Sequence, residues 1–220
     1  MMERIFEPVD PENWERQPYF DYFNNIIKCK YTINANVDIT ELLTRSKEEG
    51  VKFFPSFLYV IMRAVNQNKE FRMSYNSQNQ LGYWNYVLPS YTIFHDDDKT
   101  FSDAWSEYHE DFKLFYQTIT SDIKQYKDVK GIKARLDRPA NFCSISVLPW
   151  LSFTNFSQDT YQESNLMFPL IRFGKYFEQD NKTLIPVAVF VNHAVADGYH
   201  TSKLINDMQD FAKNVKDWML

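Results

Sequence analysis

The chain has 220 residues, a formal net charge of −5, and a composition that is 44% hydrophobic and 17% aromatic. A chain of this length can bury one large core without dividing, so we expect a single domain over residues 1–220. The basic residues are scattered, whereas binding to nucleic-acid phosphates needs clustered Lys and Arg. No apolar run approaches the roughly 18 residues that cross a bilayer. We therefore expect neither a nucleic-acid partner nor a membrane anchor.

Two further features concern compartment and metal. Cys29 and Cys143 are too few and too far apart for a disulfide framework, and the N-terminus lacks the apolar core of a signal peptide. Both features predict a cytoplasmic protein. The acidic cluster Asp96-Asp-Asp98 lacks the spaced ligands and the glycine of a calcium loop, so we expect no metal site.

Hydrophobic periodicity and turn residues divide the chain into alternating helices and strands. Helices are expected near residues 12–26 (interrupted by Pro18), 40–49, 56–68, 102–126 and 199–216. Strands are expected near residues 31–37, 71–75, 81–86, 90–95, 142–149, 166–172 and 183–191. The strands 71–75 and 81–86 flank a polar turn and predict a hairpin, so the sheet should be mixed. We therefore expect an α/β fold, a two-layer sandwich of helices against a mixed β-sheet.

One histidine stands where chemistry is plausible. His193 follows the apolar run Ile185–Val191, and an Asp-Gly turn at Asp197 precedes a helical pattern. Imidazole is the side chain whose unperturbed pKa lies nearest neutrality, so a histidine held between a strand and a turn is well placed to move a proton. Spacing alone leaves open a catalytic and a purely structural role.

The wider sequence adds a resemblance to a known family. Residues 191–198 resemble the HHxxxDG signature shared by chloramphenicol acetyltransferases and dihydrolipoyl acyltransferase cores. Longer stretches resemble the chloramphenicol acetyltransferases, in that family's order and spacing over residues 6–212. These stretches are Asn13-Trp-Glu-Arg16, Phe54-Pro-Ser-Phe-Leu-Tyr59, Glu70-Phe-Arg-Met73, Tyr91-Thr-Ile-Phe-His95, Trp105-Ser-Glu-Tyr-His-Glu-Asp-Phe112, Pro149-Trp-Leu-Ser-Phe-Thr154 and Gly174-Lys-Tyr176.

The resemblance implies a fold of the CoA-dependent acyltransferase type and a specific activity. The expected reaction is acetyl-CoA-dependent O-acetylation of chloramphenicol, an antibiotic-resistance activity. The family also implies a homotrimer whose active sites lie between neighbouring subunits. The signature histidine then comes from one subunit, and most of the acceptor pocket comes from the next.

The resemblance assigns roles to four residues. His193 aligns with the general base of a direct transfer, its ring held by a bond to its own backbone carbonyl. Ser146 aligns with the serine that donates to the tetrahedral oxyanion. Asp197 aligns with an aspartate that pairs with Arg16 and holds the active-site turn. If that pair is buried, breaking it from one side should cost ~3–5 kcal/mol.

Binding residues follow from the same alignment. Those expected near coenzyme A are Lys52, Phe54, Lys175 and Tyr176. Those expected around the acceptor are Phe23, Cys29, Phe101, Phe156, Gln158 and Arg172.

The departures from the family pattern bear on the acceptor. Asn192 and Ala196 replace a histidine and a cysteine that take no part in proton transfer. Arg172 stands where threonine is usual, Gln158 stands where leucine is usual, and residues 131–140 replace a more aromatic loop. A cation beside the site would favour an anionic or more polar acceptor and would lower the pKa of the base.

Four alternatives remain open. The acceptor is chloramphenicol or another small hydroxylated molecule, with Arg172 as the discriminating residue. A non-catalytic trimeric binding protein is the third reading, although a scaffold would not need His193 and Ser146. A dihydrolipoyl acyltransferase core fits less well, because residues 105–112 and the Leu-Pro-Trp stretch point to the acetyltransferases.

Overall fold

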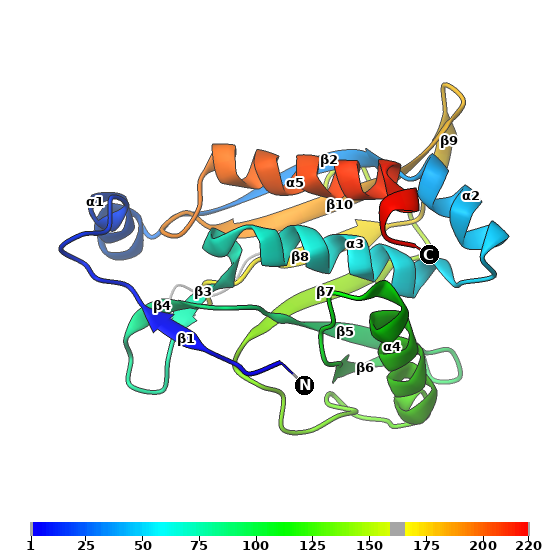
Figure 1. The fold of residues 1–220 in the computed structure, drawn as a ribbon, viewed down its shortest axis with the longest axis horizontal. Helices are drawn as coiled ribbons and strands as arrows, with labels where there is room; N and C mark the ends of the chain where they lie inside the picture. The colour runs from blue at the N-terminus through cyan, green and yellow to red at the C-terminus, as the bar shows by residue number, and fades with distance from the viewer. Residues whose placement is uncertain (1, 159–165, 220) are drawn as a thin grey trace.

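A computed structural model describes residues 2–158 and 166–219, and its centre is a mixed β-sheet (Figure 1). The strand order is β2-β10-β8-β7-β5-β6, with β9 paired to the start of β10. β7 runs parallel to both β5 and β8, and the other neighbours are antiparallel. The strands are β2 (Lys30–Asp38), β5 (Leu88–His95), β6 (Thr100–Trp105), β7 (Phe142–Leu148), β8 (Leu170–Gly174), β9 (Phe177–Gln179) and β10 (Lys182–Asn192). The expected mixed sheet is confirmed.

The expected hairpin also forms, but outside the main sheet. β3 (Met73–Tyr75) pairs antiparallel with β4 (Leu81–Trp84), and β4 pairs with β1 (Phe6–Pro8) in a small separate sheet. The main sheet is therefore mixed because of the parallel strands β5, β7 and β8 rather than because of this hairpin. Neither β1 nor β9 was expected, since three-residue strands leave almost no periodic signal.

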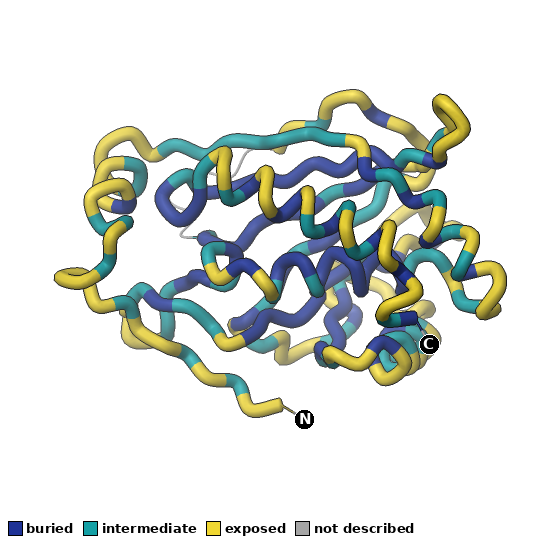
Figure 2. The backbone as a smooth tube through the Cα atoms, turned by 45° about the horizontal axis from the view of Figure 1, so that its top comes forward, coloured by how far each residue is buried: buried dark blue, intermediate teal, exposed yellow. Residues whose placement is uncertain are grey.

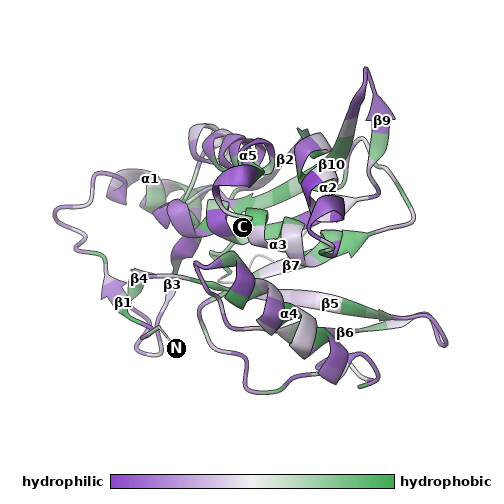
Figure 3. Ribbon diagram, turned by 45° about the vertical axis from the view of Figure 1, so that its right-hand side comes forward, coloured by the Kyte–Doolittle hydropathy of each residue, from purple (hydrophilic) through white to green (hydrophobic). Residues whose placement is uncertain are grey.

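Helices cover one face of the main sheet. They are α2 (Thr40–Glu48), α3 (Phe53–Gln67), α4 (Phe112–Tyr126) and α5 (Gly198–Lys213). Figure 1 shows α3 and α5 lying across the sheet, and in Figure 2 α3 is almost wholly buried. Figure 3 shows hydrophobic strand segments beneath α5 and α2, whose outer turns are hydrophilic. The remaining helical segments are α1 (Gln17–Asp21), the π-helical turn η1 (Tyr22–Ile26), and the 3-10 turns η2 (Lys69–Arg72) and η3 (Val215–Asp217). Among the described residues, no helix is both long enough and apolar enough to cross a membrane.

The helix expected over residues 102–126 is wrong in its first part. Residues 100–105 form β6, which pairs with β5 across a turn at residues 96–99. Long-range pairing decides the conformation here, because a strand's preference depends on its cross-strand neighbours more than on local sequence. The helix begins only after Asp111, whose side chain accepts a hydrogen bond from the Leu114 N–H as an N-cap.

Other boundaries move for local reasons. α3 begins at Phe53, and Pro55 occupies its first turn, where a backbone N–H has no partner within the helix. The strand expected at 166–172 is β8 at 170–174, and residues 166–169 are not strand. The helix expected at 12–26 begins only at Gln17.

The two faces of the main sheet carry different side chains. Because strand residues alternate, one face of β5, β7, β8 and β10 packs under the helices in a large apolar cluster. No described helix packs on the opposite face, which we call the bare face. It carries a small cluster of Phe153, Leu170, Ala188 and Phe190. It also carries the polar row, which runs across the strands and consists of Asp103, Thr92, Ser146, Arg172 and Asn34.

Candidate active site

His193 is the first residue after β10 and is half-buried in an aromatic setting. Its ring stacks on Phe23, with centroids 3.7 Å apart and planes 16° apart, and meets the Tyr31 ring edge-on at 5.1 Å. Its backbone N–H donates to the Cys29 carbonyl at 3.0 Å. Nδ1 is buried without a hydrogen-bond partner among the described residues, so the expected bond to its own carbonyl is not formed. Aromatic contacts hold the ring instead.

A contact with α5 holds the Tyr31 side chain in place. Its hydroxyl lies 2.6 Å from Thr201 Oγ1 on α5, and burial raises the pKa of Tyr31 to about 12. The phenol therefore stays neutral at any working pH. The His193 ring thus lies against the Tyr31 ring, which this contact anchors to α5.

The turn after His193 is fixed by a carboxylate. Asp197 Oδ2 accepts from Arg16 Nη1 at 2.9 Å, and Oδ1 lies 2.8 Å from His200 Nδ1 and accepts from the Tyr199 N–H at 3.0 Å. Burial alone would raise the pKa of Asp197, but hydrogen bonds from Arg16 and His200 outweigh it and lower the pKa to about 2. The Asp197 side chain is still 35% exposed, so the pair is only partly buried.

Ser146 lies in the middle of β7 on the bare face. Its Oγ is 2.9 Å from Thr92 Oγ1 on β5, and its register partner on β8 is Arg172. β7 ends at Leu148, and Pro149 follows it. Beyond the end of the strand, the Trp150 ring packs edge-on against the Phe94 ring, with centroids 4.6 Å apart. This arrangement places a hydroxyl, a second hydroxyl and a guanidinium side by side.

One chain does not bring His193 and Ser146 together. Ser146 is in register with Arg172, which pairs with Ala188 on β10, five residues before His193. At about 3.3 Å per residue and 4.8 Å between strands, the two residues lie about 17 Å apart along the strands and about 10 Å across them. A base and an oxyanion donor must both reach one acyl group, so these two cannot serve the same site within one chain.

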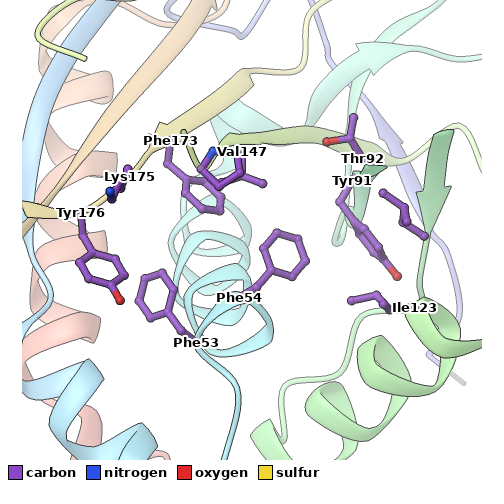
Figure 4. Close-up of a pocket in the computed structure, with 12 residues that line it drawn as sticks. Phe53, Phe54, Tyr91, Thr92, Ile123, Val147, Phe173, Lys175 and Tyr176 are labelled. Atoms are coloured by element: carbon purple, nitrogen blue, oxygen red, sulfur yellow. The ribbon is translucent and has the colours of Figure 1, made fainter. Parts of the chain in front are cut away.

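A cavity of about 380 Å³ opens between the helices and the ends of β7 and β8. Figure 4 shows Phe53, Phe54 and Phe173 around it, with Lys175 and Tyr176 toward one end and Thr92 toward the other. Lys175 and Tyr176 are exposed, which makes theirs the open end. Lys52 caps the start of α3 and is exposed beside Phe53, but it does not line the cavity.

The inner end of this cavity reaches the polar row. Thr92 lines the cavity and also bonds the Ser146 hydroxyl at 2.9 Å. Gly174 lines the cavity next to Lys175, and an added Cβ there would lie 2.7 Å from the Leu151 carbonyl oxygen. A side chain at this position would therefore collide with the Leu151 backbone.

The residues expected around the acceptor fall into separate groups. Phe23 and Cys29 lie at His193, whereas Arg172 lies beside Ser146 and Phe101 is 53% exposed on β6. Phe156 packs edge-on against Phe190 at 5.7 Å on the bare face. One chain therefore does not bring these residues into a single pocket.

Gln158 lies in a second space, a cavity of about 500 Å³ on the bare face near the end of β10. Asn34, Asn155 and Asn192 share this lining, which is more polar than that of the first cavity. Asn192 also shapes the turn, because its Oδ1 accepts from the Ala194 N–H at 3.0 Å. Asn192, which stands where the signature has its first histidine, therefore stabilises the backbone of the turn through this hydrogen bond.

Residues 131–140 are held by arginines rather than by aromatic packing. Arg135 Nη1 donates to Asp122 at 2.8 Å, and its guanidinium lies 3.7 Å from the Trp105 ring centroid. Arg138 donates to Asp103 at 2.7 Å. These two anchors fix the segment along the β6 edge of the sheet.

Four residues at the site were not singled out from the sequence. Phe53 and Thr92 line the cavity, while Tyr31 and His200 hold the His193 turn. Strand alternation carried a usable signal for Thr92, since it must face opposite to Tyr91 and Ile93. His200 also had a local signal, since it stands three residues after the N-cap Asp197, at the position that completes a capping box.

Acidic residues in the described part of the chain form no cluster suited to a metal ion. In the acidic turn, Lys130 Nζ lies 2.5 Å from Asp97 and 3.0 Å from Asp98, and Lys99 pairs with Asp96. Lysine therefore supplies the positive charge there.

Comparison with known proteins places these features in one family. Residues 4–209 match the family model described as chloramphenicol acetyltransferase. A chloramphenicol acetyltransferase of Clostridium perfringens is 42% identical over 97% of this chain and 98% of its own length. Another, from Staphylococcus aureus, is 40% identical over 97% of this chain and 99% of its own.

Solved structures agree. One described as chloramphenicol acetyltransferase superposes with a TM-score of 0.83 at 25% identity, over 94% of this chain and all of the other. The dihydrolipoamide acetyltransferase of Azotobacter vinelandii shares the fold, with a TM-score of 0.66 at 16% identity, over 87% of this chain and 84% of its own. With its full-length match, acyltransferase fold and ordered motifs, the chain belongs to the chloramphenicol acetyltransferase family.

Proposed function

We propose that the protein transfers the acetyl group of acetyl-CoA directly to a hydroxyl of chloramphenicol. The observation that carries this proposal is the cavity that leads from Lys175 and Tyr176 to Thr92, which is bonded to Ser146. Its walls are largely apolar, as the pantetheine arm of coenzyme A requires, and its open end carries a cation for phosphate. Family membership supports the choice of acceptor.

The active enzyme is a homotrimer in which each site joins His193 of one subunit to Ser146 of the next. The separation of these residues within one chain supports this arrangement. Exposed apolar side chains also gather at both places, as a head-to-tail interface needs. Near His193 they are Tyr19, Tyr22, Ile26 and Ile27, and near Ser146 they are Phe94, Phe101, Trp150 and Leu151.

His193 and Ser146 carry out the reaction. Neutral His193 takes the proton of the acceptor hydroxyl as its oxygen bonds to the thioester carbon. The carbonyl π pair moves onto oxygen, and Ser146 donates a hydrogen bond to this oxyanion. When the pair returns, the carbon–sulfur bond breaks, and the thiolate of coenzyme A takes the proton from His193. Asp197 and Arg16 keep the turn in place and do not touch the reacting atoms.

Free thiols and the use of acetyl-CoA agree with action in the cytoplasm. Cys29 and Cys143 are both unpaired. Buried Cys143 has its thiol pKa raised to about 12 by burial, so it stays protonated. Neither cysteine has a part in the transfer.

Release of free thiol from acetyl-CoA tests the activity. The purified protein is assayed with chloramphenicol and, in parallel, with a panel of other hydroxylated small molecules. We expect release that depends on chloramphenicol, and mass spectrometry should find the acetyl ester. Release only with another acceptor would keep the chemistry and reject chloramphenicol, and no release with any acceptor would favour a binding protein.

Mixed trimers test the shared site. His193→Ala and Ser146→Ala are each expected to be nearly inactive, and co-refolding them in equal amounts should restore about a quarter of wild-type activity. Only sites with intact His193 on one side and intact Ser146 on the other regain function. No recovery in a mixture shown to contain hetero-oligomers would contradict a site between subunits.

A further inference from the structure

Arg172 carries a positive charge that no described carboxylate contacts. Its Nη1 donates to the backbone carbonyls of Ser144, at 3.1 Å, and Ile171, at 3.0 Å. Burial lowers the pKa of Arg172, yet a guanidinium with so high an intrinsic pKa remains charged. A half-buried cation tied only to backbone oxygens is available to an anion that approaches from the bare face.

The nearest acid is already neutralised by another residue. Asp103 accepts from Arg138 at 2.7 Å and from Ser90 Oγ at 2.9 Å. The Arg138 guanidinium is itself seated over the Phe142 ring at 3.6 Å. Asp103 therefore acts on Arg172 only through space and leaves most of its charge unbalanced.

The sheet register places the backbone of Arg172 beside Ser146, and its guanidinium reaches the carbonyl of Ser144, two residues earlier on β7. Ser146 and Arg172 are register partners on the parallel strands β7 and β8, so their side chains leave the same face on backbones about 4.8 Å apart. Ser146 has one hydroxyl proton, and Thr92 Oγ1 lies within 2.9 Å of that hydroxyl. When Ser146 turns its proton to the substrate, Arg172 is the adjacent group with positive charge.

We propose that Arg172 is an electrostatic stabiliser of the oxyanion that forms beside Ser146. This inference rests on the proposed acetyl transfer. The negative charge exists only after the acceptor oxygen bonds to the thioester carbon, and it disappears when the carbon–sulfur bond breaks. A fixed cation, held by two carbonyls before the reaction begins, stabilises this state more than the neutral thioester, so it raises kcat.

The first test removes the charge and keeps the bulk. Arg172→Met should lower kcat by about 10- to 100-fold with chloramphenicol, with both KM values nearly unchanged, and Arg172→Lys should retain most of the lost turnover. Arg45→Met, which removes a distant arginine paired with Glu48 and Glu49, is the matched control for net charge. An unchanged or increased kcat in Arg172→Met would overturn the proposal and show that Arg172 only limits the entry of a neutral acceptor.

A binding measurement tests whether Arg172 stabilises an anion at this place, without any acetyl transfer. Coenzyme A sulfonate carries a permanent anion where the thiol group lies, and its affinity relative to coenzyme A is measured by calorimetry. Wild type should prefer the sulfonate, and Arg172→Met should lose at least about 10-fold of that preference. This binding test uses no acceptor, so it reports on Arg172 even if chloramphenicol is not the acceptor. The thiol-release assay tests the proposed function separately. Equal preference in both proteins would contradict the role of Arg172.

Discussion

The two faces of the main sheet differ in how completely their side chains find partners within the chain. Under the helices, Tyr91, Ile145 and Phe173 are at most 1% exposed and pack into one large cluster. On the bare face, Ser146 and Arg172 are only partly buried, and aromatic side chains such as Trp150 (65% exposed) lie in the open. The covered face provides the core and the cavity that we propose for coenzyme A, whereas the bare face carries the serine that we propose for catalysis and the exposed aromatic surface.

The largest expected effect lies outside both faces, at the His193 turn. His193→Gln should lower turnover by about 10²- to 10⁴-fold, because general base catalysis is lost, with little change in the melting temperature or in acetyl-CoA binding. His109→Gln is the control. His95 lies 2.7 Å from Ser102 and His200 lies 2.8 Å from Asp197, so a substitution at either would break a contact within the fold and neither serves as a control. Turnover within a few-fold of wild type would remove His193 as the base.

A substitution on the covered face should separate stability from chemistry. Leu204 on α5 is fully buried in the main cluster. Leu204→Ala should cost about 2–5 kcal/mol in unfolding free energy, because it leaves a cavity. Denaturant unfolding measures this loss, and kcat at a temperature where the variant is folded should stay near wild type. A large fall in kcat in the folded variant would break the division between the two faces.

A substitution of Ser146 on the bare face should have the opposite result, with turnover lost and stability unchanged. Ser146→Ala should lower kcat by roughly 10²-fold while KM stays nearly constant, because the lost hydrogen bond forms mainly in the transition state. The unfolding free energy and the elution volume on sizing should not change. Thr92→Val, which removes the hydroxyl bonded to Ser146, is the companion variant and should have a smaller effect. A change confined to KM would mean that Ser146 binds the ground state.

The smallest expected effect concerns the pair that fixes the turn. Asp197 binds its proton more weakly in the folded chain, at a pKa of about 2, than in the unfolded chain, at about 3.9. Its contribution is therefore complete above about pH 4 and is lost as the pH falls toward about 2. Arg16→Gln should cost roughly 1 kcal/mol near neutral pH, since the pair is partly exposed, and should flatten the stability profile in that window. An unchanged profile measured by acid unfolding would show that Arg16 does not lower the pKa of Asp197.

Local pattern predicted the elements whose signal is local. The strands around 31–37 and 183–191 and the helix after residue 198 are present, because alternation or helical spacing runs through each. Residues 102–105 were misassigned because their strand conformation depends on pairing with β5. The site followed the same rule: motif residues were identifiable, while Thr92 and Tyr31 gain their places only from contacts with distant segments.

The sequence by itself determined the family and identified the candidate base, serine and ion pair, because each lies in a short segment with a recognisable order of residues. Only the tertiary structure decided that Ser146 and His193 lie at different places in one chain, that the cavity ends at Thr92, and that Arg172 is the register partner of Ser146. These facts depend on strand register. A shift by one residue turns every side chain of a strand to the opposite face, so register follows from the packing of the whole sheet rather than from any one segment.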